Sequence, residues 1–472
     1  MPAAFRNREF EFAQPDGSTI RLRGSGNQFE ARFETLGGHP VIRNADGYFV
    51  RTPAIPTESP RLAASTFPKL AAHPDRTLSR WELRRQQKMR LRRDLTMSTE
   101  GGLAPPARPT IGTVIGLTLL VDFEDDPAKI PQDEVDRFCN QQGYETYGNN
   151  GSVRDYFFDV SNGRLTYTNM VLPYYRASKP KSYYAEATVA FEERAQELLR
   201  EALLYHLEQG TNFTALSSDA DGFVRAVNLY YAGSCTNAWC EGLWPHQSTL
   251  ATKVALPDGR QFADYQMSDM NDRLTLGTFC HENGHMICDF PDLYRYSGNG
   301  TGVGVYCLMC VGGMDRYETN PVEVGAYLKR EAGWGSDVSN RAASEITLNA
   351  AANEFLIYPK SAHEYFVIEN RSASGRDAGL PSSGLAVWYV DETASNTDPA
   401  PFYECELLQA DGKQDLELGV NEGDASDLFN SSTKALFDSA TNPSSTWRDG
   451  QPSGLTLAEI PAAAAAMRFR YG

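Results

Sequence analysis

The sequence predicts an α+β protein built from several domains. The chain has 472 residues, of which 41% are hydrophobic, and this length suggests about two to four domains. Short alternating segments separated by turn residues occupy both ends of the chain, which indicates β-structure there. The middle combines a nearly continuous apolar run with apolar residues at helical spacing. We therefore divide the chain into 1–108, 109–335 and 336–472.

The first segment, 1–108, is expected to be short-stranded and to end in a linker. A basic, helix-prone run covers 79–94, and a Gly/Pro-rich linker covers 101–109. The basic run is either a solvent-exposed helix face or a joint open to proteases. The predicted strands are 9–13, 19–22, 29–35 and 48–51, with turns at Asp16-Gly17, Gly37-Gly38 and Asp46-Gly47.

The second and third segments differ in the secondary structure that they predict. In 109–335, strands are expected at 114–121, 164–171 and 223–231, and helices at 153–158, 190–209 and 276–287. In 336–472, strand-like runs at 354–358, 365–370 and 384–389 alternate with Gly, Pro, Asn and Ser, which predicts a C-terminal β-sandwich-like domain.

Charge and composition exclude some classes of function. The net charge is 44 − 61 = −17, which argues against a nucleic-acid partner. No apolar run approaches the roughly 20 residues of a membrane span. The N-terminus shows no apolar signal-peptide core, so the sequence leaves export and a cytoplasmic location both open. Six of the eight cysteines lie between 235 and 310 in three close pairs, which favours local disulfides over buried thiols.

The most informative motif is formed by two of the seven histidines, His281 and His285, around Glu282. Residues four apart project from one face of a helix, so both imidazoles can reach one ion. Glu282 lies one step around the helix, where a carboxylate can reach a water without binding the metal. Zinc catalysis divides the labour in this way, and a catalytic zinc needs a third protein ligand.

The stretch from His281 to His285, His-Glu-Asn-Gly-His, followed by Phe290-Pro-Asp-Leu-Tyr294, resembles the immune inhibitor A-like family of zinc metalloproteases. Further family-like stretches occur in the family's order. They are 14–17, 120–123, 155–163, 364–371 and 384–391.

This resemblance implies a zincin (metzincin-like) catalytic domain at 109–335, with 1–108 as a pro-region of a secreted zymogen. It implies a zinc-dependent endopeptidase that cleaves protein or peptide substrates through a zinc-activated water. His281 and His285 would bind Zn²⁺, and Glu282 would be the general base.

The third ligand implied by the resemblance is Asp292. The sequence departs from the family here, because Cys288 replaces a glycine and Asp292 follows His285 by one residue more than usual. Asp289 therefore competes, and His246 or Glu323 are more distant alternatives. His246, in a stretch that also resembles the family, is more readily explained as a structural histidine.

Other residues carry weaker expectations. Met309 resembles the Met-turn below the zinc, and Tyr294 and Tyr317 are candidate oxyanion donors. A structural Ca²⁺ has no supporting EF-like motif, and the acidic run Asp122–Asp126 is better explained as a turn.

The remaining expectations concern how the enzyme is kept latent and whether the protein is catalytically active at all. The first cysteine is Cys139, so the pro-region has no thiol for the zinc. Cleavage between Arg84 and Arg108 is expected to raise activity. The alternative function is a catalytically inactive zincin-like scaffold that acts as an extracellular binding protein.

Overall fold

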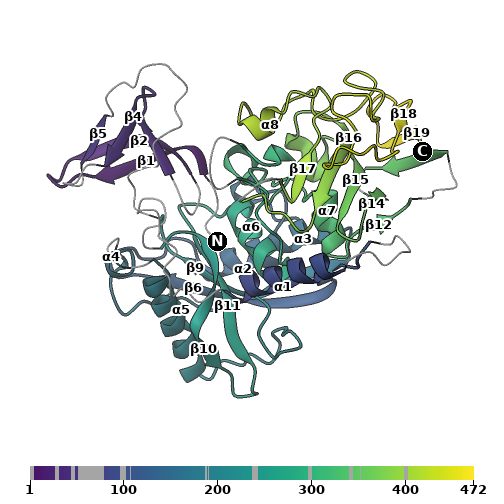
Figure 1. Ribbon diagram of the computed structural model, residues 1–472. Helices are drawn as coiled ribbons and strands as arrows, with labels where there is room; N and C mark the ends of the chain where they lie inside the picture. Colours follow the sequence, from purple (N-terminus) through teal and green to yellow (C-terminus); the bar gives the residue numbers. More distant parts are fainter. Residues whose placement is uncertain are drawn as a thin grey trace. The chain divides into compact units, whose positions relative to one another are not determined.

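The computed structural model describes residues 5–26, 31–43, 48–51, 79–95, 103–106, 108–186, 189, 191–235, 243–295, 300–339, 344–350, 352–397 and 402–472. These residues form a mixed α+β structure with several sheets, as predicted (Figure 1). They divide into two compact units: unit 1 is 1–80, 117–132 and 171–273, and unit 2 is 81–116, 133–170 and 274–472. Each unit draws on several segments, so the three domains stay a prediction.

Unit 1 begins with an antiparallel sheet of five strands in sequence order; four of them match the predicted strands, and the one at 40–43 was not predicted. Its strands are β1 (Phe5–Ala13), β2 (Thr19–Gly26), β3 (Ala31–Thr35), β4 (Pro40–Arg43) and β5 (Phe49–Arg51). One face of this sheet is buried because its apolar residues pack together, and Trp244 joins them. The cluster contains Phe12, Leu22, Phe33, Val41, Phe49 and Trp244. The predicted turn at Asp46-Gly47 lies outside the described residues.

A second sheet of unit 1 has the order β10-β11-β9-β6, with β8 paired to β6. Its strands are β6 (Gly112–Asp122), β8 (Tyr175–Arg176), β9 (Val227–Tyr231), β10 (His246–Ala255) and β11 (Gln261–Asp269), and its helices are α4 (Lys181–Tyr184) and α5 (Phe191–Glu208). The β6 and β9 strands are parallel, and β9 is fully buried, which explains why all of its residues except Asn228 are hydrophobic. This strand begins later than predicted because Val224 instead forms an isolated bridge with Ser218.

Unit 2 contains most of the helices. They are α1 (Arg80–Asp94, in unit 2 from Trp81), α2 (Gln132–Asn140, from Asp133), α3 (Val153–Val160), α6 (Leu276–Cys288), α7 (Ala326–Glu331) and α8 (Asp415–Leu418), with 3-10 turns at Thr146–Gly148, Gly304–Tyr306, Asp315–Tyr317 and Gly375–Gly379. Strand β7 (Leu165–Val171) also belongs mainly to this unit. The helices predicted at 79–94, 153–158 and 276–287 are confirmed as α1, α3 and α6. Helix α3 starts where it does because Ser152 and Asp155 form a capping box.

The C-terminal part of unit 2 consists of two sheets around a shared apolar core. One sheet has the order β12-β14-β15-β16-β17 and the other β13-β19-β18. The strands are β12 (Ser336–Asp337), β13 (Glu345–Asn349), β14 (Glu354–Pro359), β15 (Glu364–Arg371), β16 (Gly384–Asp391), β17 (Cys405–Leu407), β18 (Leu457–Ala458) and β19 (Ala466–Tyr471). Phe366 and Ile368 of β15 lie in this core. Because side chains alternate along a strand, Glu369 and Arg371 belong to the other face of β15.

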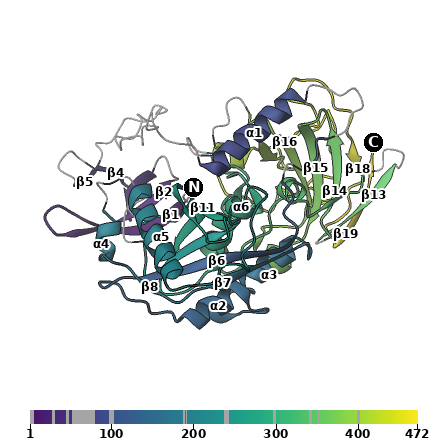
Figure 2. The ribbon, with the colours of Figure 1, turned by 90° about the horizontal axis from the view of Figure 1, so that it is seen from below.

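Two expectations about the N-terminal helix and the linker are corrected. The basic run is a helix, but several of its charges are paired rather than solvated: Arg92 is 6% exposed and pairs with Glu392, whereas Arg90 and Arg93 are exposed. The stretch after it is packed in part, since Ala104 is buried and its amide donates to the Ala362 carbonyl at 3.1 Å. Figure 2 shows α1 beside β16, whose end precedes Glu392.

The expected disulfides are not formed among the close pairs that the structure describes. Cys280, Cys307 and Cys310 are buried thiols. Burial raises the pKa of Cys307 to about 11 and raises the pKa of Cys280 as well, so both stay protonated at neutral pH. The remaining pair includes Cys240, which lies outside the described residues.

Candidate metal centre

Helix α6 places the histidine pair in the interior of unit 2. His281, Glu282 and His285 are each at most 2% exposed. The helix is closely packed at both of its glycines. A Cβ on Gly277 would lie 1.8 Å from the Gly313 carbonyl oxygen, and one on Gly284 would lie 2.8 Å from Met309 Sδ. The glycine of the motif therefore lets Met309 approach the turn that carries both imidazoles.

Backbone carbonyls fix the orientation of both imidazole rings. His281 Nδ1 lies 3.0 Å from the Leu308 carbonyl oxygen, and His285 Nδ1 lies 2.6 Å from the Phe290 carbonyl oxygen. A carbonyl only accepts, so each Nδ1 carries the proton and each Nε2 presents a lone pair when the ring is neutral. Metal-binding histidines are oriented by this kind of partner.

Asp292 brings a carboxylate to the same point. Its Oδ1 lies 3.2 Å from His281 Nε2 and 3.1 Å from His285 Nε2, and the two Nε2 atoms are 3.2 Å apart. Zinc ligands at about 2.0–2.1 Å in a tetrahedron lie about 3.3 Å from one another. The three donor atoms therefore match one face of such a tetrahedron, and this buried group could hold a metal ion.

The electrostatics of the centre favour a cation. Although burial opposes ionisation, the two imidazoles hold the pKa of Asp292 well below its usual range. Glu282 lies in the same interior, where burial raises its pKa. A carboxyl whose pKa is raised toward neutrality is suited to accept and release a proton.

The alternative third ligands have other partners. Asp289 ends α6 in a left-handed conformation with φ 56°, and it pairs with Arg84 at 2.7 Å and Arg108 at 2.9 Å. Glu323 pairs with Lys329. In unit 1, the ring nitrogens of His246 contact the Trp244 carbonyl at 2.6 Å and the Tyr265 hydroxyl at 3.0 Å.

The structure separates the two candidate oxyanion donors. The ring of Tyr294 stacks on that of His281 with centroids 6.4 Å apart. Burial and the charges of Asp292 and Glu282 raise the pKa of Tyr294, so it is a hydrogen-bond donor beside the centre. The Tyr317 hydroxyl instead donates to the Gly379 carbonyl at 3.0 Å.

Trp81 of α1 is a neighbour of the centre that sequence reasoning missed. Its ring meets that of His285 edge-on, with centroids 5.7 Å apart. From Trp81 onwards α1 is part of unit 2, and ion pairs along its length hold it against the rest of that unit. They are Arg84–Asp289, Arg85–Glu404, Lys88–Glu331, Lys88–Glu392 and Arg92–Glu392. The signal in the sequence was a tryptophan at the start of a basic helix, which does not by itself indicate what it contacts.

Two acidic groups bear on the question of calcium. In unit 1, Asp122 pairs with Arg176 at 2.6 Å, and Asp126 pairs with Lys181 at 2.7 Å, so both carboxylates have side-chain cations as partners. A second group, Asp411, Asp415 and Asp424, is partly exposed. Lys413 pairs with Asp411 at 2.6 Å, so the ammonium group of a lysine already lies at this group of aspartates.

Comparisons with known proteins add no family assignment. No protein-family model matches the chain, and no curated protein matches it significantly. Within the residues that the structure describes, none of the helices has the length and apolar character needed to cross a membrane.

Proposed function

We propose that this protein is a zinc-dependent endopeptidase of the immune inhibitor A-like type, with a zincin catalytic domain. The observation that carries the proposal is the convergence of two imidazole Nε2 atoms and one carboxylate oxygen within 3.2 Å of one another. A glutamate on the same helix supplies the base that peptide hydrolysis requires. Export of the protein rests on the sequence resemblance alone.

In this mechanism His281, His285 and Asp292 hold Zn²⁺. When bound, zinc polarises a peptide carbonyl and lowers the pKa of a water molecule. Glu282 accepts the proton of the attacking water and passes it to the leaving amine, for which its buried position and raised pKa are suited. Tyr294, whose ring stacks on that of His281 and whose raised pKa keeps its hydroxyl protonated, is the proposed donor to the developing oxyanion.

The position of α1 supports a latent form. Trp81 lies against a proposed metal ligand, and α1 belongs to the segment that the sequence assigns to a pro-region. A substrate that must reach His285 from this side would have to displace Trp81. The full-length chain is therefore proposed to be a zymogen.

The test compares wild type with Glu282→Gln, each before and after limited proteolysis of the 84–108 region. Zinc content and casein cleavage are measured on the same samples. We expect about one zinc per chain in both proteins, because Glu282 is not a ligand. We expect turnover by the trimmed wild type and a loss of about a hundredfold or more in the variant.

The inactive scaffold predicts a different result. Stoichiometric zinc without cleavage of casein or of other protein substrates, before and after trimming, would favour it. Trimming is essential to this comparison, because a latent enzyme and a dead one behave alike while α1 is docked.

A further inference from the structure

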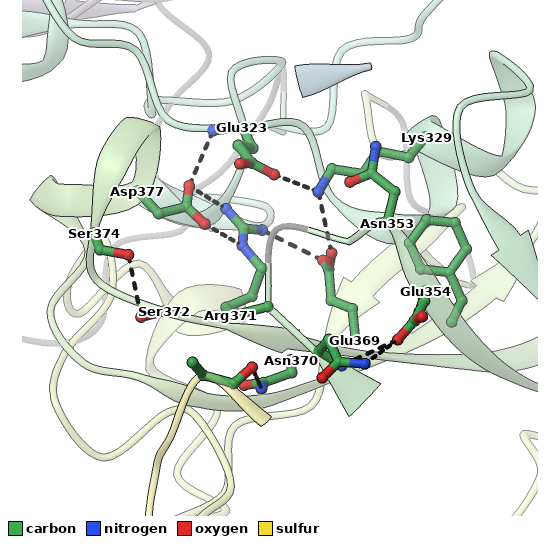
Figure 3. Close-up of a pocket in the computed structure, with 14 residues that line it drawn as sticks. Glu323, Lys329, Asn353, Glu354, Glu369, Asn370, Arg371, Ser372, Ser374 and Asp377 are labelled. Atoms are coloured by element: carbon green, nitrogen blue, oxygen red, sulfur yellow. Dashed lines mark hydrogen bonds and ion pairs between the residues drawn. The ribbon is translucent and has the colours of Figure 1, made fainter. Parts of the chain in front are cut away.

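A buried ion cluster in unit 2 contacts the 306–308 segment, whose Leu308 carbonyl meets His281. It combines two cations and three carboxylates beside a cavity of about 230 Å³ (Figure 3): Glu323, Lys329, Glu369, Arg371 and Asp377. The side chains of Arg371 and Glu369 are 2% and 4% exposed. Buried ion pairs are often replaced by apolar residues without loss of stability. Stability alone is thus a weak reason for this cluster, whose hydrogen bonds also hold the backbone around Tyr306 and Glu323 in place.

Arg371, at the end of β15, is the centre of the cluster. Its Nε and Nη2 donate to the two carboxylate oxygens of Asp377 at 2.5 Å and 2.7 Å. Its Nη1 donates to the Tyr306 carbonyl at 3.0 Å. The planar guanidinium binds all of these acceptors at once, which a lysine ammonium on a flexible stem does not reproduce.

Asp377 connects Arg371 to Leu308, the residue whose carbonyl orients His281. Its Oδ1 accepts the Glu323 amide at 3.0 Å, and the Glu323 carbonyl accepts the Leu308 amide at 3.4 Å. The segment from Tyr306 to Leu308 is therefore held at one end by Arg371 and at the other through Glu323.

The held segment is the one that meets the histidine. The Leu308 carbonyl accepts the proton of His281 Nδ1 at 3.0 Å. A shift of this carbonyl turns the imidazole and moves its Nε2 away from His285 and Asp292. The contacts thus form a continuous path from the C-terminal sheet to the proposed metal site.

We propose that Arg371 is a positioning residue of the metal centre. Through Tyr306 and Asp377 it fixes the Leu308 carbonyl and with it the ring of His281. The inference rests on the metal site proposed above. It gives the C-terminal sheet a role in metal binding.

The test uses full-length Arg371→Lys and Asp377→Asn, with Ile368→Val as the matched control. Arg371→Lys keeps the positive charge but loses the planar guanidinium that binds both Asp377 oxygens. Asp377→Asn keeps the shape of that side chain but loses its negative charge. Ile368 lies on the same strand and faces the apolar core instead. The readouts are the Zn²⁺ dissociation constant by chelator competition and the visible spectrum of the Co²⁺-substituted protein, with denaturation midpoints to compare stability.

We expect zinc binding to weaken by about tenfold in both cluster variants, as for other outer-shell changes. The cobalt spectrum should shift in both variants, while Ile368→Val should match wild type in both readouts even if it is less stable. Wild-type affinity and spectrum in the two cluster variants would overturn the inference and leave the metal site standing. Absence of zinc binding by wild type would overturn both.

Discussion

The two aspartates that compete for the third metal position differ in their surroundings. Asp292 meets the two imidazoles, whereas Asp289 lies between two arginines. We predict that Asp292→Asn weakens zinc binding by more than about a hundredfold, the upper end of the range for outer-shell changes. Asp289→Asn should leave the zinc dissociation constant near that of wild type. Chelator competition on the two matched variants checks this, and the reverse order would assign the ligand to Asp289.

Sequence reasoning at the residue scale reaches side chains but not backbone partners. Spacing places His281 and His285 on one helix face with Glu282 one step around, and the resemblance adds Asp292. The Leu308 and Phe290 carbonyls that orient the rings have no residue signature, because every residue carries a carbonyl. The contact of Trp81 with His285 depends on how α1 packs, which neither charge nor periodicity encodes.

At the scale of elements, the docking of α1 is expected to depend on pH. The pKa of Glu392 is lowered: burial opposes its ionisation, but Lys88, Arg330 and Arg92 outweigh burial. The pKa of Asp289 is lowered by Arg108 and Arg84 in the same way. A carboxyl with a depressed folded-state pKa stabilises the docked form above its ordinary pKa, and this contribution is lost as the pH falls through the folded value.

We therefore predict that α1 stays docked from neutral pH down to about 4.5 and loosens below that. Hydrogen exchange of peptides from α1, after correction for the intrinsic rate at each pH, gives the measurement. Peptides from α5 serve as the control, since this helix has no part in the ion pairs. Equal changes in both helices would indicate global acid unfolding instead of undocking.

The elements themselves were predictable where the local signal was strong. The apolar spacing of α5 and the buried run of β6 each specify their structure locally. The fate of the basic run was not predictable, because a helix with seven cations looks the same whether it faces water or carboxylates. Its partners, such as Glu392 and Glu404, lie some 300 residues further along the chain.

For the whole molecule, the proposed latency predicts a gain of activity on trimming. If α1 is docked in nine of ten molecules, removal of the region before Arg108 should raise casein cleavage by about tenfold, since activity scales with the competent fraction. Trypsin-trimmed and untrimmed samples are compared at equal zinc content. Glu282→Gln treated in the same way must stay inactive, which excludes contaminating trypsin. Equal activity of the two wild-type samples would contradict the latency.

The loop that follows the metal ligands also has consequences for how such a chain can vary over evolution. Thr301 and Val305 donate their amides to the Leu416 and Glu422 carbonyls at 2.7 Å and 2.8 Å, and Tyr306 accepts from Arg371. Part of the scaffold around this loop is thus encoded after residue 335. A recombination event at that boundary would pair one lineage's loop with another lineage's partners. The two segments are therefore expected to be inherited together and to diverge in step.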